Sequence, residues 1–100
     1  MKIRYLPDAH GELKEGVAYY HERNPVAARR FAEAIRQEER HLVEQPLSAP
    51  KTVSEFRSWR IPRFPYSLVY RIADQEALIV ALAHHSRRPG YWKARLREAH

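Results

Sequence analysis

Residues 66–84, YSLVYRIADQEALIVALAH, are the most informative about the fold because they contain two strand-like segments joined by a short turn. Tyr66–Ile72 and Ala77–His84 are rich in aromatic and β-branched residues, which favour strands. The second segment is apolar at almost every position, as is typical of a central strand covered on both faces. A third strand-like run, Glu55–Ile61, precedes them across the proline-bounded segment Pro62–Pro65. We therefore expect an antiparallel meander.

Alternation along these runs predicts which side chains share a face of the sheet. In the middle run, one side carries Tyr66, Leu68, Tyr70 and Ile72. In the last run, the alternation predicts two sets on opposite faces: Leu78, Val80, Leu82 and His84 on one, and Ile79, Ala81, Ala83 and His85 on the other.

The N-terminal part of the chain predicts a short strand followed by a helix. Lys2–Leu6 has strand-like composition and is stopped by Pro7, after which Asp8 is the expected N-cap of a helix. Leu13, Val17 and Tyr20 then recur at helical spacing and form one buried stripe.

A second helix is expected to follow at a tight corner, with Asn24 as its N-cap and Pro25 in its first turn. One face of this helix is apolar, with Ala27, Phe31, Ile35 and Leu42. The helix ends near Gln45-Pro46, residues 47–54 form a loop, and the tail after Pro89-Gly90 is a short helix.

Together these elements predict one α+β domain spanning residues 1–100, in the order β-α-α-β-β-β with a short C-terminal helical tail. The helical hairpin packs on a small antiparallel sheet whose edge is completed by the N-terminal strand. The opposite face of the sheet stays free, and a functional surface is expected there.

The composition of the chain indicates the kind of partner we expect and excludes several kinds of chemistry. Eighteen Lys and Arg residues against twelve Asp and Glu leave a formal net charge of +6, which points to an anionic partner. The chain contains no cysteine, so disulfides and thiolate chemistry are excluded. The sequence shows neither a signal peptide nor a membrane span, so we expect a cytoplasmic protein with no membrane contact. The histidines lack the spacing of metal ligands, and no metal or cofactor is expected.

The segment AHHSRRPGYW, residues 83–92, collects the side chains best suited to chemistry. Histidine exchanges a proton near neutral pH, arginine stabilises a developing phosphorane, and tyrosine stacks on an exposed base. Each also has a structural interpretation: His84 is in phase with core residues, and Tyr91 and Trp92 can pack the tail on the sheet.

The same segment resembles the H-x-x-R-x-P-x-Y-W ending of many RelE/ParE-family toxins, a plasmid-stabilisation family. RFPYSLVY, residues 63–70, is similar to the family's F-P-Y-x-x-x-Y strand, and Tyr19-Tyr20, Ala28 and Phe31 fit its helical hairpin. The resemblance covers nearly the whole chain in the correct order. It implies a growth-inhibiting toxin of a type II toxin–antitoxin module, bound by a cognate antitoxin in a hetero-oligomer.

The resemblance leaves two targets open, because ParE-like members inhibit DNA gyrase whereas RelE-like members cut messenger RNA on the ribosome. One ribonuclease branch has an arginine in the middle strand and a histidine-tyrosine pair after the last. Here Ser67 takes the place of that arginine and Ser86 that of the tyrosine, while His85 matches the histidine. A second ribonuclease branch has a lysine-rich sheet face, but this chain has no lysine between Lys51 and Lys93.

Losing one charge-stabilising group costs a nuclease about a hundredfold in rate. We therefore favour the ParE-like, non-enzymatic interpretation over the ribonuclease. A third and weaker interpretation is a basic RNA-binding module without toxicity.

The candidate residues follow from these alternatives. For a ribonuclease, the catalytic candidates are His85, Arg87 and Tyr91. The candidates for binding the target are Arg60, Arg71, His84 and Arg88. The antitoxin is expected along the hairpin and the sheet, where Tyr20, Phe31 and Ile35 would leave apolar area exposed in the free protein.

Overall fold

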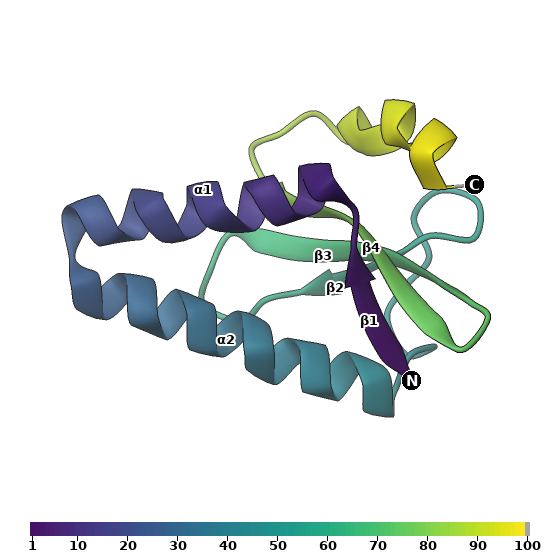
Figure 1. Ribbon diagram of the computed structural model, residues 1–100, viewed down its shortest axis with the longest axis horizontal. Helices are drawn as coiled ribbons and strands as arrows, with labels where there is room; N and C mark the ends of the chain where they lie inside the picture. Colours follow the sequence, from purple (N-terminus) through teal and green to yellow (C-terminus); the bar gives the residue numbers. More distant parts are fainter. Residues whose placement is uncertain (100) are drawn as a thin grey trace.

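Two helices joined by a tight corner lie across one face of a four-stranded sheet (Figure 1). The computed structural model describes the backbone of residues 1–99 and the side chains of residues 1–96. The elements, in chain order, are β1 (Lys2–Tyr5), α1 (Pro7–Arg23), α2 (Pro25–Glu44), β2 (Arg57–Arg60), β3 (Tyr66–Ala73), β4 (Glu76–His84) and the 3-10 helix η1 (Tyr91–Ala99). This confirms the predicted order and the predicted helical hairpin on a small sheet.

The sheet has the strand order β1-β4-β3-β2. The meander β2-β3-β4 is antiparallel, as predicted. The structure differs at the edge, where β1 lies parallel to β4, with Tyr5 opposite Ile79. The helical hairpin carries the chain back past the sheet before the meander begins, so the first and last strands run in the same direction and the sheet is mixed (Figure 1).

A β-bulge interrupts the pairing of β3 with β4. Val69 lies opposite Ala81, but Tyr70 lies opposite Ile79, so Val80 is an extra residue in β4. Because an extra residue shifts the alternation, Leu78 and Leu82 point to opposite faces of the sheet. The prediction that Leu78 shares a face with Leu82 and His84 is therefore wrong.

The two helices begin in different ways. Helix α1 starts at Pro7 after Leu6, which makes no side-chain capping bond, so the prediction of Asp8 as N-cap is wrong. Proline already has the φ angle of a first helical residue, and it starts the helix two residues earlier than expected, because Leu6 takes the N-cap position instead of Asp8. At the corner, Asn24 caps α2 by accepting a hydrogen bond from the Val26 amide at 2.9 Å, as predicted.

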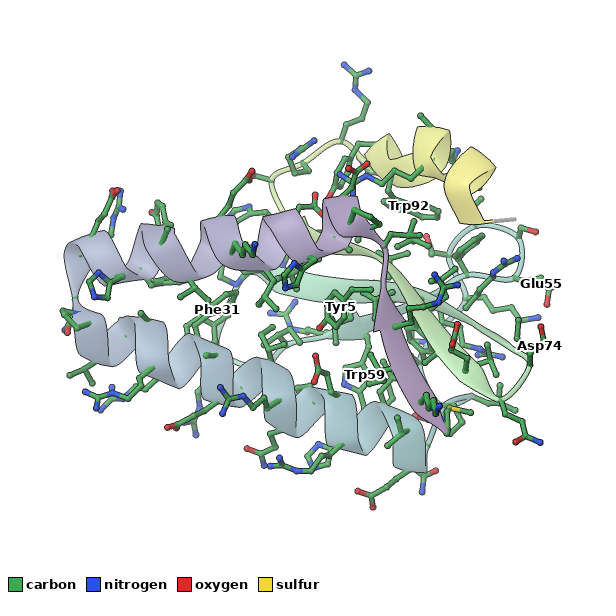
Figure 2. The ribbon with its side chains drawn as sticks, viewed as in Figure 1. Tyr5, Phe31, Glu55, Trp59, Asp74 and Trp92 are labelled. Carbon is green, nitrogen blue, oxygen red and sulfur yellow. The ribbon has the colours of Figure 1, made fainter. Side chains whose placement is uncertain are left out.

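The core lies between the hairpin and the sheet, and its centre is an aromatic cluster around Phe31 (Figure 2). The Phe31 ring centroid lies 5.0–5.1 Å from the ring centroids of Tyr20, Phe64 and Tyr66. Helix α1 approaches closely because Gly16 has no side chain: a Cβ there would lie 2.9 Å from the Phe31 ring. This contact holds the two helices together over the sheet.

The C-terminal tail packs back on the fold through Trp92, at the start of η1 (Figure 2). Its ring is buried and lies 5.2 Å from the ring of Phe56. The predicted packing of Trp92 is confirmed, and the tail helix takes the 3-10 form. Among the helices of the described residues, none is sufficiently long and apolar to cross a membrane.

Candidate functional site

The face of the sheet opposite the hairpin carries a hollow of about 240 Å³ at the end of β4. The prediction that this face stays free is wrong in part, because the buried Trp92 of the tail packs there beside Val69; we keep the name free face for the side away from the hairpin. Trp59 of β2 donates its indole N–H to Glu38 of α2, so Trp59 marks the helical face and its neighbour Ser58 lies on the free face. The lining residues that matter here are Ser58, Ser67, His85, Arg87, Arg88 and Tyr91. The hollow also includes His84, so it gathers all three catalytic candidates and two of the candidates for target binding.

His85 lies at the edge of this hollow with its ring exposed. Its Nε2 atom is 3.0 Å from Oγ of Ser67, and its backbone N–H donates to the Pro65 carbonyl at 2.8 Å. Desolvation lowers the pKa of His85 below its usual 6.5, and the positive charge of Arg60 lowers it further. The neutral form of the ring therefore predominates at pH 7.

His84 points to the opposite side of the strand and contacts its neighbours there. Its Nδ1 atom accepts a hydrogen bond from the backbone N–H of Ser86 at 3.0 Å, so its proton in the neutral form is on Nε2. Its ring contacts Tyr66 edge to face, with the ring centroids 5.0 Å apart. The structural interpretation of His84 as a half-buried, satisfied residue agrees with this geometry.

Both the ring and the hydroxyl of Tyr91 contact other side chains. The hydroxyl donates a hydrogen bond to Glu12 of α1. The guanidinium of Arg87 lies 3.9 Å from the ring centroid and covers one face of it. Burial and the bond to Glu12 together raise the pKa of Tyr91 well above its usual 10, so the phenol keeps its proton.

Glu12 contacts both sides of the tail loop, residues 85–91, which leads from the end of β4 into η1. The sequence did not identify Glu12 as a site residue. It accepts hydrogen bonds from the Leu82 amide at 3.0 Å and from both terminal nitrogens of Arg95, at 2.8 and 3.0 Å. Arg95 also donates to the Val80 carbonyl at 3.0 Å. The pairing of β1 with β4 ends at Ile79, so these two side chains satisfy the edge of β4 beyond it. No local pattern links residues so distant in sequence.

The remaining arginines differ in their relation to the hollow. Arg88 is exposed and lines it. Arg60 lies opposite Ser67 in the sheet, close enough to affect the pKa of His85. Arg71 lies further along β3, opposite Leu78, with its guanidinium 5.9 Å from the Phe56 ring centroid, and it does not line the hollow. The structure therefore does not bring Arg71 together with the other candidates.

The exposure predicted for the antitoxin-binding residues is wrong for two of the three. Phe31 is fully buried and Ile35 is 2% exposed, because both fill the interior of the hairpin. Tyr20 stays partly exposed. The large apolar side chains exposed on the hairpin are Tyr19 and Val26, at 48% and 43%. Within the described residues, no group of three or more His, Asp or Glu residues is placed to hold a metal ion.

A family model and a solved structure both match this chain. The family model described as "ParE toxin of type II toxin-antitoxin system, parDE" matches residues 3–89. A solved structure titled "Chromosomal ParDE TA system from P. aeruginosa" has the same fold, with a TM-score of 0.72 at 20% identity, covering 84% of this chain and 95% of that chain. The comparison with curated proteins gives no significant match. The predicted resemblance is confirmed, and the chain belongs to the ParE toxin family of type II toxin–antitoxin systems.

Proposed function

We propose that this protein is a growth-inhibiting toxin that binds and inhibits DNA gyrase in the cytoplasm. A cognate antitoxin, bound in a hetero-oligomer, would hold it inactive. Its membership of the ParE family and its net charge of +6 support an anionic target such as an enzyme–DNA complex. On this proposal the exposed arginines at the free face of the sheet, Arg60 and Arg88, contact the target.

One observation carries the choice of gyrase over messenger RNA: the side chains that a metal-free ribonuclease would use are engaged elsewhere. The hydroxyl of Tyr91 is bound to Glu12 and its ring is covered by Arg87. Desolvation and the charge of Arg60 lower the pKa of His85, so the protonated ring that would act as a general acid is the minor form at pH 7. Ser67, which contacts His85, supplies no positive charge.

The second candidate is a ribosome-dependent ribonuclease, and the hollow on the free face favours it. His85, Arg87 and Tyr91 come from separate positions of the tail loop and still line a single hollow of about 240 Å³. A neutral His85 would then act as the base that activates a ribose hydroxyl, and Arg87 would have to leave Tyr91 to reach a phosphate.

Two assays on the purified protein and on induced cells separate these candidates. The first measures ATP-dependent supercoiling of relaxed plasmid by purified gyrase with increasing amounts of this protein. The second maps messenger RNA 5′ ends shortly after induction without antitoxin, with growth recorded alongside. We expect inhibited supercoiling, arrested growth and intact messages. New message ends at defined codon positions with unaffected supercoiling would overturn the proposal in favour of the ribonuclease.

Matched variants test the binding face. Arg60→Gln and Arg88→Gln should each weaken gyrase inhibition several-fold, because each removes an exposed charge from the interface. Arg36→Gln removes an exposed charge from α2, on the other side of the sheet, and should leave inhibition unchanged. Equal effects of all three substitutions would show that net charge alone matters and would refute a specific free-face interface. Growth that continues during full expression of the unmodified protein would refute toxicity itself.

A further inference from the structure

A second hollow, of about 280 Å³, lies on the helical side of the tail loop, between α1 and the end of β4. Unlike the free-face hollow, it contains carboxylates and phenols together. The lining residues that carry the argument are Glu12, Glu15, Tyr19, Tyr66, Arg87 and Tyr91. We refer to it as the α1 recess.

The bottom of the α1 recess is formed by Tyr66, whose ring is buried and whose hydroxyl has no hydrogen-bond partner among the described residues. Tyr66 is 9% exposed, and its hydroxyl makes no hydrogen bond to any described residue. Gly16 lies directly opposite: a Cβ built there would be 3.5 Å from the Tyr66 hydroxyl oxygen. This oxygen is not among the buried atoms that lack a partner, so it is open to solvent and can accept a hydrogen bond from a group entering the recess.

The charges around this phenol favour a cation. The carboxylate of Glu12 is compensated by its two hydrogen bonds from Arg95. Glu15 is exposed, and within the described residues it makes neither an ion pair nor a hydrogen bond. Burial raises the pKa of Tyr66, and the neighbouring tyrosines and the charges of Glu15 and Glu12 raise it further. The two carboxylates thus lower the electrostatic potential at this hydroxyl, which favours a positively charged partner.

The walls of the α1 recess suit a flat cation. Tyrosine faces attract guanidinium groups, and this surface already holds two such pairs. The guanidinium of Arg23 lies 3.6 Å from the Tyr19 ring centroid, and that of Arg87 lies 3.9 Å from the Tyr91 centroid. Arg87 lines the recess itself, but its stacking on Tyr91 keeps its charge on that wall rather than beside Glu15.

We propose that the α1 recess binds the guanidinium group of an arginine side chain presented by a protein partner. Glu15 pairs with the charge, the Tyr66 hydroxyl accepts a hydrogen bond from a guanidinium N–H, and the plane of the group contacts the parts of the Tyr19 and Tyr91 rings that Arg23 and Arg87 leave uncovered. The identity of the partner, the antitoxin, rests on the proposed function. The recess and its ligand chemistry do not.

The test uses the whole toxin and a small probe, N-acetyl-arginine methylamide, titrated into the ¹⁵N-labelled protein and followed by NMR. We expect saturable shifts of the Gly16, Tyr66 and Leu82 amides, with a dissociation constant on the order of millimolar for a single side chain. The citrulline analogue has nearly the same shape without the charge and should give no saturable shift. Equal binding of citrulline, or no saturable shift with the arginine probe, would overturn the proposal.

Variants assign the binding to the recess. Glu15→Gln should weaken arginine binding about fivefold, the value of one exposed charge pair. Tyr66→Phe removes the hydroxyl, keeps the ring and should weaken binding several-fold, with its thermal unfolding measured to confirm folding. Glu44→Gln removes an equal charge from an exposed position at the end of α2 and should leave binding unchanged. Equal losses for Glu15→Gln and Glu44→Gln would refute a specific site.

The lysine analogue tests the role of the flat guanidinium. Weaker binding of N-acetyl-lysine methylamide supports stacking on the tyrosines, and equal binding would overturn the guanidinium assignment. Because neither gyrase nor the antitoxin is present, failure of this titration leaves the proposed function standing. Conversely, if this protein neither inhibits gyrase nor arrests growth, the proposed function fails but the proposal that the α1 recess binds arginine does not.

Discussion

The carboxylate of Glu12 is held by the guanidinium of Arg95 in two parallel hydrogen bonds of 2.8 and 3.0 Å, which join residues 83 positions apart. Both side chains are largely withdrawn from solvent, at 11% and 15% exposure. The pair connects α1, the edge of β4 and η1 at one point. It thereby fixes the loop that carries His85, Arg87 and Tyr91.

Replacing Glu12 by glutamine should destabilise the protein by about 2–4 kcal/mol, because it leaves a partly buried guanidinium without its counter-charge. Urea unfolding measures the change, and Glu15→Gln on the exposed face of α1 is the control, expected within about 0.5 kcal/mol of the unmodified protein. The double variant Glu12→Gln/Arg95→Gln should lose less than the sum of the single losses. Strict additivity would show that the pair contributes nothing as a pair.

Two glycines of α1 should respond to alanine in opposite directions. At Gly11 a Cβ meets nothing within 4 Å, so Gly11→Ala should raise the free energy of unfolding by about 0.5–1 kcal/mol through helix propensity. At Gly16 the Cβ would lie 2.9 Å from the Phe31 ring, so Gly16→Ala overpacks the core and should lower the free energy of unfolding by about 1–2 kcal/mol. Thermal or urea unfolding of both variants checks this, and a stabilising Gly16→Ala would contradict the close packing of α1 on Phe31.

The helix starts offer another matched pair. Asn24→Ala should cost about 1 kcal/mol, because the Val26 amide loses its cap. Asp8→Ala removes no cap and breaks only an exposed contact with Arg95 at 3.5 Å, so its cost should stay within about 0.5 kcal/mol. Equal costs in urea unfolding would mean that α1 relies on Asp8 in solution.

His85 should titrate below 6.5 when followed by NMR, and Arg60→Gln should raise its pKa because a neighbouring positive charge is removed. Arg88→Gln is the control, since Arg88 is not among the groups that shift this pKa, and it should leave the titration unchanged.

The lowered pKa has a consequence for stability. Between the folded pKa and 6.5 the unfolded chain binds more protons at this histidine than the folded chain. The contribution of His85 to stability therefore falls as the pH falls through that window. A titration at or above 6.5 would remove this effect, together with the argument that His85 is neutral at pH 7.

The candidate site was only partly predictable from the sequence. The tail loop follows the end of β4 directly, so the grouping of His85, Arg87, Arg88 and Tyr91 around one hollow is a local property. Arg71 was grouped with them by charge alone. Whether its place along β3 brings it to the same hollow depends on strand register, which composition does not report. The burial of Phe31 and Ile35 likewise depended on how closely α1 approaches α2.

The two helices, the corner at Asn24-Pro25, the antiparallel meander and the family could all be inferred from the amino-acid sequence, because hydrophobic period, capping and turn residues act between near neighbours in the chain. Four features became visible only in the folded chain: the parallel pairing of β1 with β4, the bulge at Val80, the Gly16–Phe31 contact and the Glu12–Arg95 pair. Each of these joins segments distant in sequence, and their energies come from packing and charge pairing that exist only once the chain has folded.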